Sequence, residues 1–190
     1  MIKFVYVIYL SMFIWMLPPF KQYGTKYFVY FVLMAVSDPL AILTAKYTEI
    51  TVMQFFLFIM GLQFSSILNK KRIKVAIILS LVINSLIVIF ISNPNIIRLI
   101  ASMYLIAILF VLVTEQYFYY ERKSINLFLS LMILNVLINI IRFFSFTISP
   151  TWGITTFYMG VIVQIIFALL FTFINIKTKI GFNKLGRGKD

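Results

Sequence analysis

The sequence predicts an all-α integral membrane protein with seven transmembrane helices, an external N-terminus and a cytoplasmic C-terminus. Hydrophobic residues occupy 63% of the 190 positions and charged residues only 12%, which leaves too few polar side chains to cover a water-soluble globule. The apolar residues form seven runs, each long enough to cross a hydrocarbon layer as a helix. The basic residues between these runs are distributed unequally, and this asymmetry sets the orientation.

Short polar breaks separate the seven runs. The first run ends at the Pro18-Pro19 pair, and no small-residue cleavage site follows it, so we interpret it as a retained helix rather than a secretory signal. Pro94 and Pro150 lie in two later breaks, which are so short that the helices on either side must be antiparallel neighbours. The runs cover residues 4–17, 27–45, 51–68, 75–91, 96–118, 125–148 and 152–176.

The orientation follows from the positive-inside rule. Of the seventeen Lys and Arg residues, only Lys3, Lys46, Arg98 and Arg142 fall on the predicted outer side. The thirteen on the predicted cytoplasmic side are Lys21, Lys26, Lys70, Lys71, Arg72, Lys74, Arg122, Lys123, Lys177, Lys179, Lys184, Arg187 and Lys189.

The chain divides into a seven-helix transmembrane bundle, residues 1–176, and a basic cytoplasmic tail, residues 177–190. Because the positive-inside distribution accounts for most of the net charge of +12, we expect no nucleic-acid partner. The tail and the 70–74 cluster are expected to lie on anionic lipid at the cytoplasmic face of the bilayer. The absence of Cys and of an N-glycosylation sequon favours a multi-pass protein of a bacterial plasma membrane.

Composition also predicts that the protein is not an enzyme and has no cofactor or metal site. The chain contains neither Cys nor His, which excludes thiolate chemistry and histidine-based proton relays, zinc sites and haem ligation. Asp38 is the only acidic residue near the middle of a run, so one chain cannot assemble an aspartyl dyad.

Asp38 and a stripe on the sixth run are the main candidates for a functional site, because polar groups in hydrocarbon are costly and usually face the bundle interior. Asp38 lies about 16 Å from the inner end of its run, near the midplane, and precedes a proline. Asn135, Asn139 and Arg142 follow i, i+4, i+7 spacing and share one helix face.

Asn84 and Gln164 fall at a similar depth, so a polar layer across the bundle is predicted. Two interpretations of this layer stay open. It is either a buried network that determines which helices pair, or a ligand- or ion-binding site formed by Asp38, Asn84, Asn135, Asn139, Arg142 and Gln164.

Two functions are compatible with these features. The first is a non-catalytic structural, accessory or sensory subunit that docks a membrane-protein partner, since no loop is long enough to form a separate domain. The second is a small transporter or ligand-binding membrane protein whose polar site is reached from outside. Seven helices with an external N-terminus match, in topology only, the sugar carriers in which two three-helix repeats flank a linker helix.

The topology predicts the location of both termini. A reporter fused before Met1 should be external and one fused after Lys189 should be cytoplasmic, because the basic residues divide thirteen to four between the two sides. Protease accessibility of both reporters in intact cells measures this. An external C-terminal reporter would contradict the seven-helix count.

Overall fold

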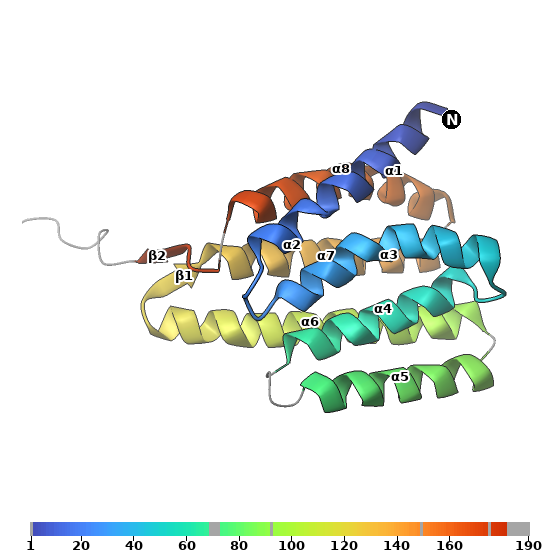
Figure 1. The fold of residues 1–190 in the computed structure, drawn as a ribbon, viewed down its shortest axis with the longest axis horizontal. Coiled ribbons are helices and arrows are strands. Elements are labelled where there is room, and N and C mark those ends of the chain that lie inside the picture. Colours follow the sequence, from blue (N-terminus) through green and yellow to red (C-terminus); the bar gives the residue numbers. More distant parts are fainter. Residues whose placement is uncertain (1, 69–72, 92, 149, 175, 182–190) are drawn as a thin grey trace, which may run out of the picture.

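Helices account for nearly all of the described residues in the computed structural model (Figure 1). The structure describes residues 2–68, 73–91, 93–148, 150–174 and 176–181. Within these ranges the elements are α1 (Ile2–Trp15), α2 (Leu17–Lys21), α3 (Phe28–Tyr47), α4 (Val52–Ile67), α5 (Ile73–Phe90), α6 (Pro94–Glu121), β1 (Ser124–Asn126), α7 (Leu127–Ile148), α8 (Pro150–Phe173) and β2 (Lys179–Gly181).

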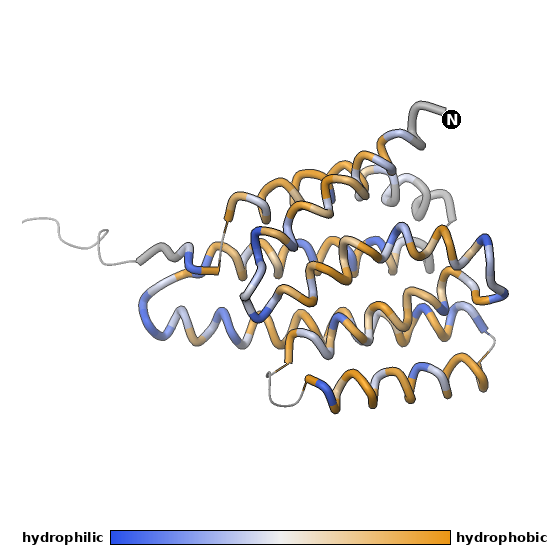
Figure 2. The backbone as a smooth tube through the Cα atoms, in the orientation of Figure 1, coloured by the Kyte–Doolittle hydropathy of each residue, from blue (hydrophilic) through white to orange (hydrophobic). Residues whose placement is uncertain are grey.

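The all-helical class predicted from the sequence is confirmed. In the described part of the chain, four helices are long and apolar enough to cross a membrane: Phe28–Tyr47, Ile73–Phe90, Pro94–Glu121 and Leu127–Ser145. Val52–Ile67 and Tyr158–Phe173 are apolar but shorter. Figure 2 shows hydrophobic residues along most of each helix and hydrophilic residues mainly towards the two ends of the bundle. The count of seven spans stays a prediction.

The first long helix, α1, ends at Trp15, close to the Pro18-Pro19 pair, as predicted. The chain bends after Trp15 and continues directly into α2, which begins with these prolines in its first turn. Proline fits there because the first helical N–H groups have no intrahelical acceptor and the fixed φ angle suits a helix. Two other helices begin with side-chain caps: Thr51 and Gln54 form a capping box at the start of α4, and Asn93 caps α6.

Six long helices form a closed ring. Going round it, α1 packs on α3, α3 on α4, α4 on α6, α6 on α7, α7 on α8, and α8 on α1. The ring therefore consists of two consecutive three-helix units, α1–α3–α4 and α6–α7–α8, which meet where α4 contacts α6 and where α8 contacts α1. Helices in these two contacts run in the same direction, whereas neighbours within a unit are antiparallel (Figure 1).

Most of the described basic residues lie at one end of the bundle, here termed the basic end. This end carries the α2–α3 and α6–β1 connections and the segment after α8 (Figure 1). Six of the thirteen predicted cytoplasmic residues lie outside the described residues, at positions 70–72, 184, 187 and 189. Described members are Lys21, Lys26, Lys74, Arg122, Lys123 and Lys177, and Lys179 lies in β2.

Polar side chains fasten the basic end. Lys26 forms an ion pair with Glu115, and the Tyr27 hydroxyl donates a hydrogen bond to the same carboxylate. Gln22, which is fully buried, donates to the carbonyl oxygens of Phe171 at 3.0 Å and Ile174 at 2.9 Å. These contacts link the α2–α3 connection to α6, through Glu115, and to the end of α8, through the Phe171 and Ile174 carbonyls.

The short antiparallel ladder of β1 and β2 was not predicted. Ser124 pairs with Gly181 and Asn126 with Lys179, so the first residues of the basic tail are held beside the α6–α7 connection. Asn126 strengthens the junction by donating to the Ile176 carbonyl at 2.8 Å. The rest of the tail lies outside the described residues.

α5 lies outside the ring and packs mainly on α4. Its buried side chains are polar: Ser80 and Asn84 face Gly61 of α4, where a Cβ atom would collide with both. Asn84 donates to Ser80 at 3.3 Å and to the Leu57 carbonyl at 3.4 Å, and it accepts from the Tyr104 hydroxyl at 3.0 Å. Small residues and interhelical hydrogen bonds are the usual means of attaching a helix that has apolar surroundings on its other sides.

This packing predicts opposite outcomes for two serines of α5. Ser80→Leu should lower the free energy of unfolding by about 1–3 kcal/mol, because the larger side chain overpacks the contact with Gly61. Ser85→Leu is the matched control: Ser85 is exposed, so the same change should leave stability nearly unaltered. Thermal unfolding in a mild detergent compares them, and equal losses would refute the α4–α5 contact.

Candidate functional site

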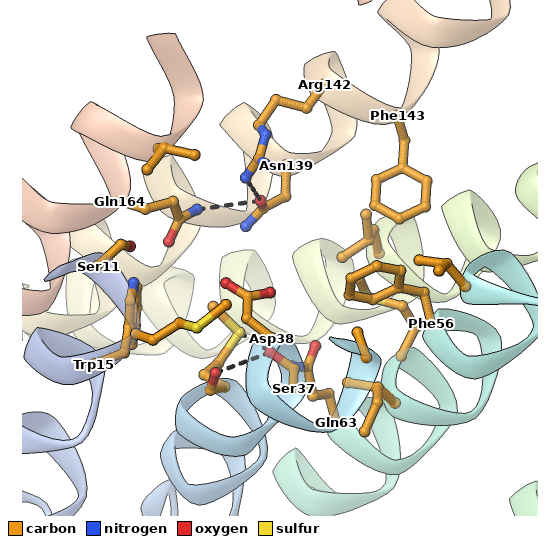
Figure 3. A pocket seen from close by; sticks show the side chains of 18 of the residues that line it. Ser11, Trp15, Ser37, Asp38, Phe56, Gln63, Asn139, Arg142, Phe143 and Gln164 are labelled. Atoms are coloured by element: carbon orange, nitrogen blue, oxygen red, sulfur yellow. Dashed lines mark hydrogen bonds between the residues drawn. The ribbon is translucent and has the colours of Figure 1, made fainter. Parts of the chain in front are cut away.

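A cavity of about 400 Å³ lies inside the ring (Figure 3). Each of the six ring helices contributes side chains to its wall, and α5 contributes none. Most of the wall is apolar, including Met12, Trp15, Met34, Phe56 and Met60. The polar side chains in the wall are Ser11, Ser37, Asp38, Gln63, Arg98, Asn139, Arg142 and Gln164.

The cavity is closed towards the basic end by aromatic packing. Trp15 and Tyr30 line its floor and belong to a buried cluster with Phe31, Phe128 and Phe171. Ring centroids of Phe31 and Phe171 are 4.9 Å apart, and Trp15 stacks on Phe31 at 6.4 Å, so the floor is densely filled.

The rim of the cavity lies towards the opposite end of the bundle. Ile42 and Val52, both exposed, line it there, together with Arg98 from the first turns of α6. A solute would therefore enter from the end away from the basic residues.

Asp38 and Arg142 face each other across the cavity. The Asp38 carboxylate points from α3 into the open space, towards the Arg142 side chain that descends from α7 (Figure 3). The two charges attract each other electrostatically. Gly160 of α8 makes room for Arg142, because a Cβ at that position would lie 2.6 Å from Arg142 Cδ and Nε. The missing side chain at Gly160 therefore leaves space on α8 for a charged side chain of α7.

A chain of amide hydrogen bonds supports Arg142 on one side. Arg142 Nη1 donates to Asn139 Oδ1 at 3.3 Å. The Gln164 Nε2 group donates to two oxygens, Asn135 Oδ1 at 3.0 Å and Asn139 Oδ1 at 3.1 Å. Because Nε2 has both of these acceptors, the orientation of the Gln164 amide is fixed by the network. Its Oε1 is left buried without a hydrogen-bond donor.

Four of the six predicted site residues meet in this cavity: Asp38, Asn139, Arg142 and Gln164. Asn135 lies directly behind them, 1% exposed, where its Oδ1 accepts from Gln164 Nε2 at 3.0 Å. Asn135 therefore holds the amide chain in place without lining the cavity.

Asn84 is not part of this group. Its depth in the bundle was predicted from its position along α5, but depth does not specify which helices are neighbours. Because α5 stands outside the ring, Asn84 points into the contact with α4 and α6 and hydrogen-bonds there. Its side chain is fully buried in that contact.

Three polar contributors were not selected from the sequence. Arg98 was interpreted as a residue near the outer surface, yet it lines the cavity, and its Nε is buried without a hydrogen-bond partner. Gln63 lines the wall and donates to the Met34 sulfur at 3.1 Å. Ser11 comes from α1, whose serine gave no distinguishing pattern. A charged residue one turn inside a membrane helix was the available signal for Arg98.

The side chains around the cavity are suited to binding a small molecule. Cationic donors come from Arg98 and Arg142, acceptors from Asp38 and Gln164, and apolar contact area from the remaining wall. Among the described residues, no group of three or more His, Cys, Asp or Glu side chains could hold a metal ion. A concave, mostly apolar pocket with a few convergent polar groups is typical of a small-molecule site.

The contact between Gly160 and Arg142 predicts coupled substitutions. Gly160→Ala should destabilise the protein by about 1–3 kcal/mol, because the added methyl group displaces the Arg142 side chain. In an Arg142→Gln background the shorter side chain should relieve the collision, so the same change should cost less. A double-mutant cycle of unfolding free energies measures this coupling. Additive losses would mean that Gly160 acts independently of Arg142.

Comparison with known proteins gives no functional assignment. No protein-family model, no curated protein and no solved structure matches this chain. The function must therefore be inferred from the residues that surround the cavity.

Proposed function

We propose that the chain crosses a bacterial plasma membrane seven times, with its N-terminus outside and its C-terminus in the cytoplasm. Three features support this. The long helices α1, α3, α4, α5, α6, α7 and α8 alternate in direction, four of them satisfy the length and hydropathy of a span, and most of the described basic residues lie at one end. In this orientation the basic end is cytoplasmic and the rim of the cavity faces outwards.

Within this frame, we propose that the protein is a non-catalytic binding protein or carrier for a small solute, which enters the cavity from outside. The observation that carries the proposal is the cavity itself, because six helices surround it and three charged side chains line it. Charged groups within a membrane are costly to maintain and usually mark a site for a substrate or an ion.

The cavity favours this function over that of a purely structural subunit. A network that serves only to pair helices is stable when all its polar atoms are satisfied and its core is filled. Here Gln164 Oε1 and Arg98 Nε are buried without partners next to about 400 Å³ of open volume. A solute bound in this volume can accept a hydrogen bond from Arg98 Nε.

A cavity-filling substitution tests the proposal. Ala41 is buried and lines the cavity, whereas Ala45 lies one turn further along α3 and is exposed. Ala41→Phe should occupy the binding volume and abolish solute binding, and Ala45→Phe should retain it. Native mass spectrometry of each protein, purified from its own membranes in mild detergent, should find a bound small molecule in the wild type and in Ala45→Phe only.

The same preparation distinguishes the alternative. A stoichiometric membrane-protein partner that copurifies with all three proteins, with no bound solute in any of them, would favour the accessory-subunit function and count against a binding protein. Thermal unfolding of Ala41→Phe provides the folding control, because the substitution fills open volume and should not lower stability.

A further inference from the structure

We propose, building on the solute-binding function above, that the ligand is a monoanionic amphiphile: an acidic headgroup, such as a carboxylate, on an apolar chain. Three observations carry this inference: the balance of charges in the cavity, the unpaired state of Arg98, and the character of the apolar wall.

The cavity holds one more positive than negative charge. Arg98, Arg142 and Asp38 line it, and Asp38 and Arg142 attract each other across the open space. Their charges therefore compensate one another, and the surplus positive charge belongs to Arg98. Arg98 lies at the rim of the cavity with its Nε buried and without a hydrogen-bond partner, and a bound anion supplies an acceptor and compensates the charge.

Among the described residues, no acidic side chain forms an ion pair with Arg98. The sequence has five acidic residues, and in the described ranges the one ion pair within 4 Å joins Lys26 to Glu115. Asp38 faces Arg142, and Glu49 and Glu121 are exposed. The buried Nε of Arg98 is thus a donor in need of an acceptor, and a guanidinium binds a carboxylate or phosphate through paired hydrogen bonds.

The apolar part of the wall suits a flexible chain. Met12, Met34, Met53 and Met60 contribute from three helices, and Trp15 closes the floor. Methionine side chains are unbranched and adaptable, so they fit ligands of varied shape. A volume of about 400 Å³ lies within the range of sites for small organic molecules and excludes a whole diacyl lipid. A lipid could insert only a headgroup and part of one chain.

Charge complementarity argues against other ligands. A cation or a neutral amphiphile would leave Arg98 uncompensated, and a cation would add a third positive charge near Arg142. A zwitterion would preserve the surplus charge of the empty cavity. Only a net negative ligand neutralises the site, and interfaces with matched charges discriminate strongly against partners of the wrong sign.

Three probes with the same ten-carbon chain test this inference: decanoate, decanol and decyltrimethylammonium. The protein is reconstituted in nanodiscs of phosphatidylcholine, and the shift of its unfolding temperature is titrated with each probe. Decanoate should stabilise the wild type in a saturable manner, and the neutral and cationic probes should not. Decanol or decyltrimethylammonium binding as tightly as decanoate would overturn the anion assignment.

Substitutions of Arg98 test whether this residue is responsible for the binding of decanoate. Arg98→Gln should weaken decanoate binding about tenfold or more, whereas Arg98→Lys retains the charge and should keep the preference for the anion. Arg122→Gln is the control, since Arg122 is exposed at the basic end. Because Arg98 has no acidic partner, its neutralisation should not lower the unfolding temperature of the empty protein. Unchanged decanoate affinity in Arg98→Gln would refute the inference.

Two further arms separate the remaining outcomes. Nanodiscs that contain phosphatidylglycerol should show whether the anion comes from the bilayer, in which case the lipid competes with decanoate in the wild type but not in Arg98→Gln. Absence of competition indicates a free solute, and either source agrees with an anionic ligand.

If Ala41→Phe responds to every probe as the wild type does, the cavity is not the binding site and the proposed function fails as well. If decanol or decyltrimethylammonium binds the wild type and Ala41→Phe abolishes that binding, the cavity is a binding site and the proposed function stands. Only the anionic class of the ligand is then wrong.

Discussion

A charge inside a membrane must find its counterpart within the protein, and this constraint organises the bundle. Asp38 and Arg142 lie on opposite walls of the ring, so α3 and α7 must face the same interior space. Arg142 can lie there only because Gly160 leaves room on α8 and because Asn139 accepts its hydrogen bond. Gln164 then binds both asparagines of α7 and fixes the α7–α8 pair. Two opposite charges that face each other across the cavity thereby relate three helices.

Polar side chains also find their partners within the protein at two other places, and these contacts position the remaining helices. At the basic end, Glu115 receives Lys26 and Tyr27, and Gln22 reaches the last carbonyls of α8. On the outer flank, Asn84 and Ser80 turn towards Gly61 and attach α5 to α4. Apolar contacts alone cannot distinguish one helix neighbour from another in hydrocarbon, because lipid is equally apolar. Polar contacts specify the order of the helices.

Hydropathy and spacing predicted the helical class, most helix boundaries to within a few residues, and the shared face of Asn135, Asn139 and Arg142. They also predicted that Asp38 and Gln164 would lie at the same depth, and the structure brings both to one cavity. Depth along a helix can be counted from the sequence, but the identity of neighbouring helices cannot. That is why Asn84 was assigned to the wrong contact and why Arg98 was missed. The β1–β2 ladder joins segments more than fifty residues apart and left no local pattern to detect.

The β1–β2 ladder has a mechanical consequence. It joins the chain before α7 to the chain after α8, so at the basic end these two helices are tied together and the α6–α7–α8 unit should move as one body. If the protein is the proposed carrier, a passage from the cavity to the basic end would have to open where the two three-helix units meet. There the Gln22 hydrogen bonds hold α2 against α8, and the Lys26–Glu115 ion pair holds the residue before α3 against α6. An opening at this joint would have to break these contacts, whereas the ladder could stay intact.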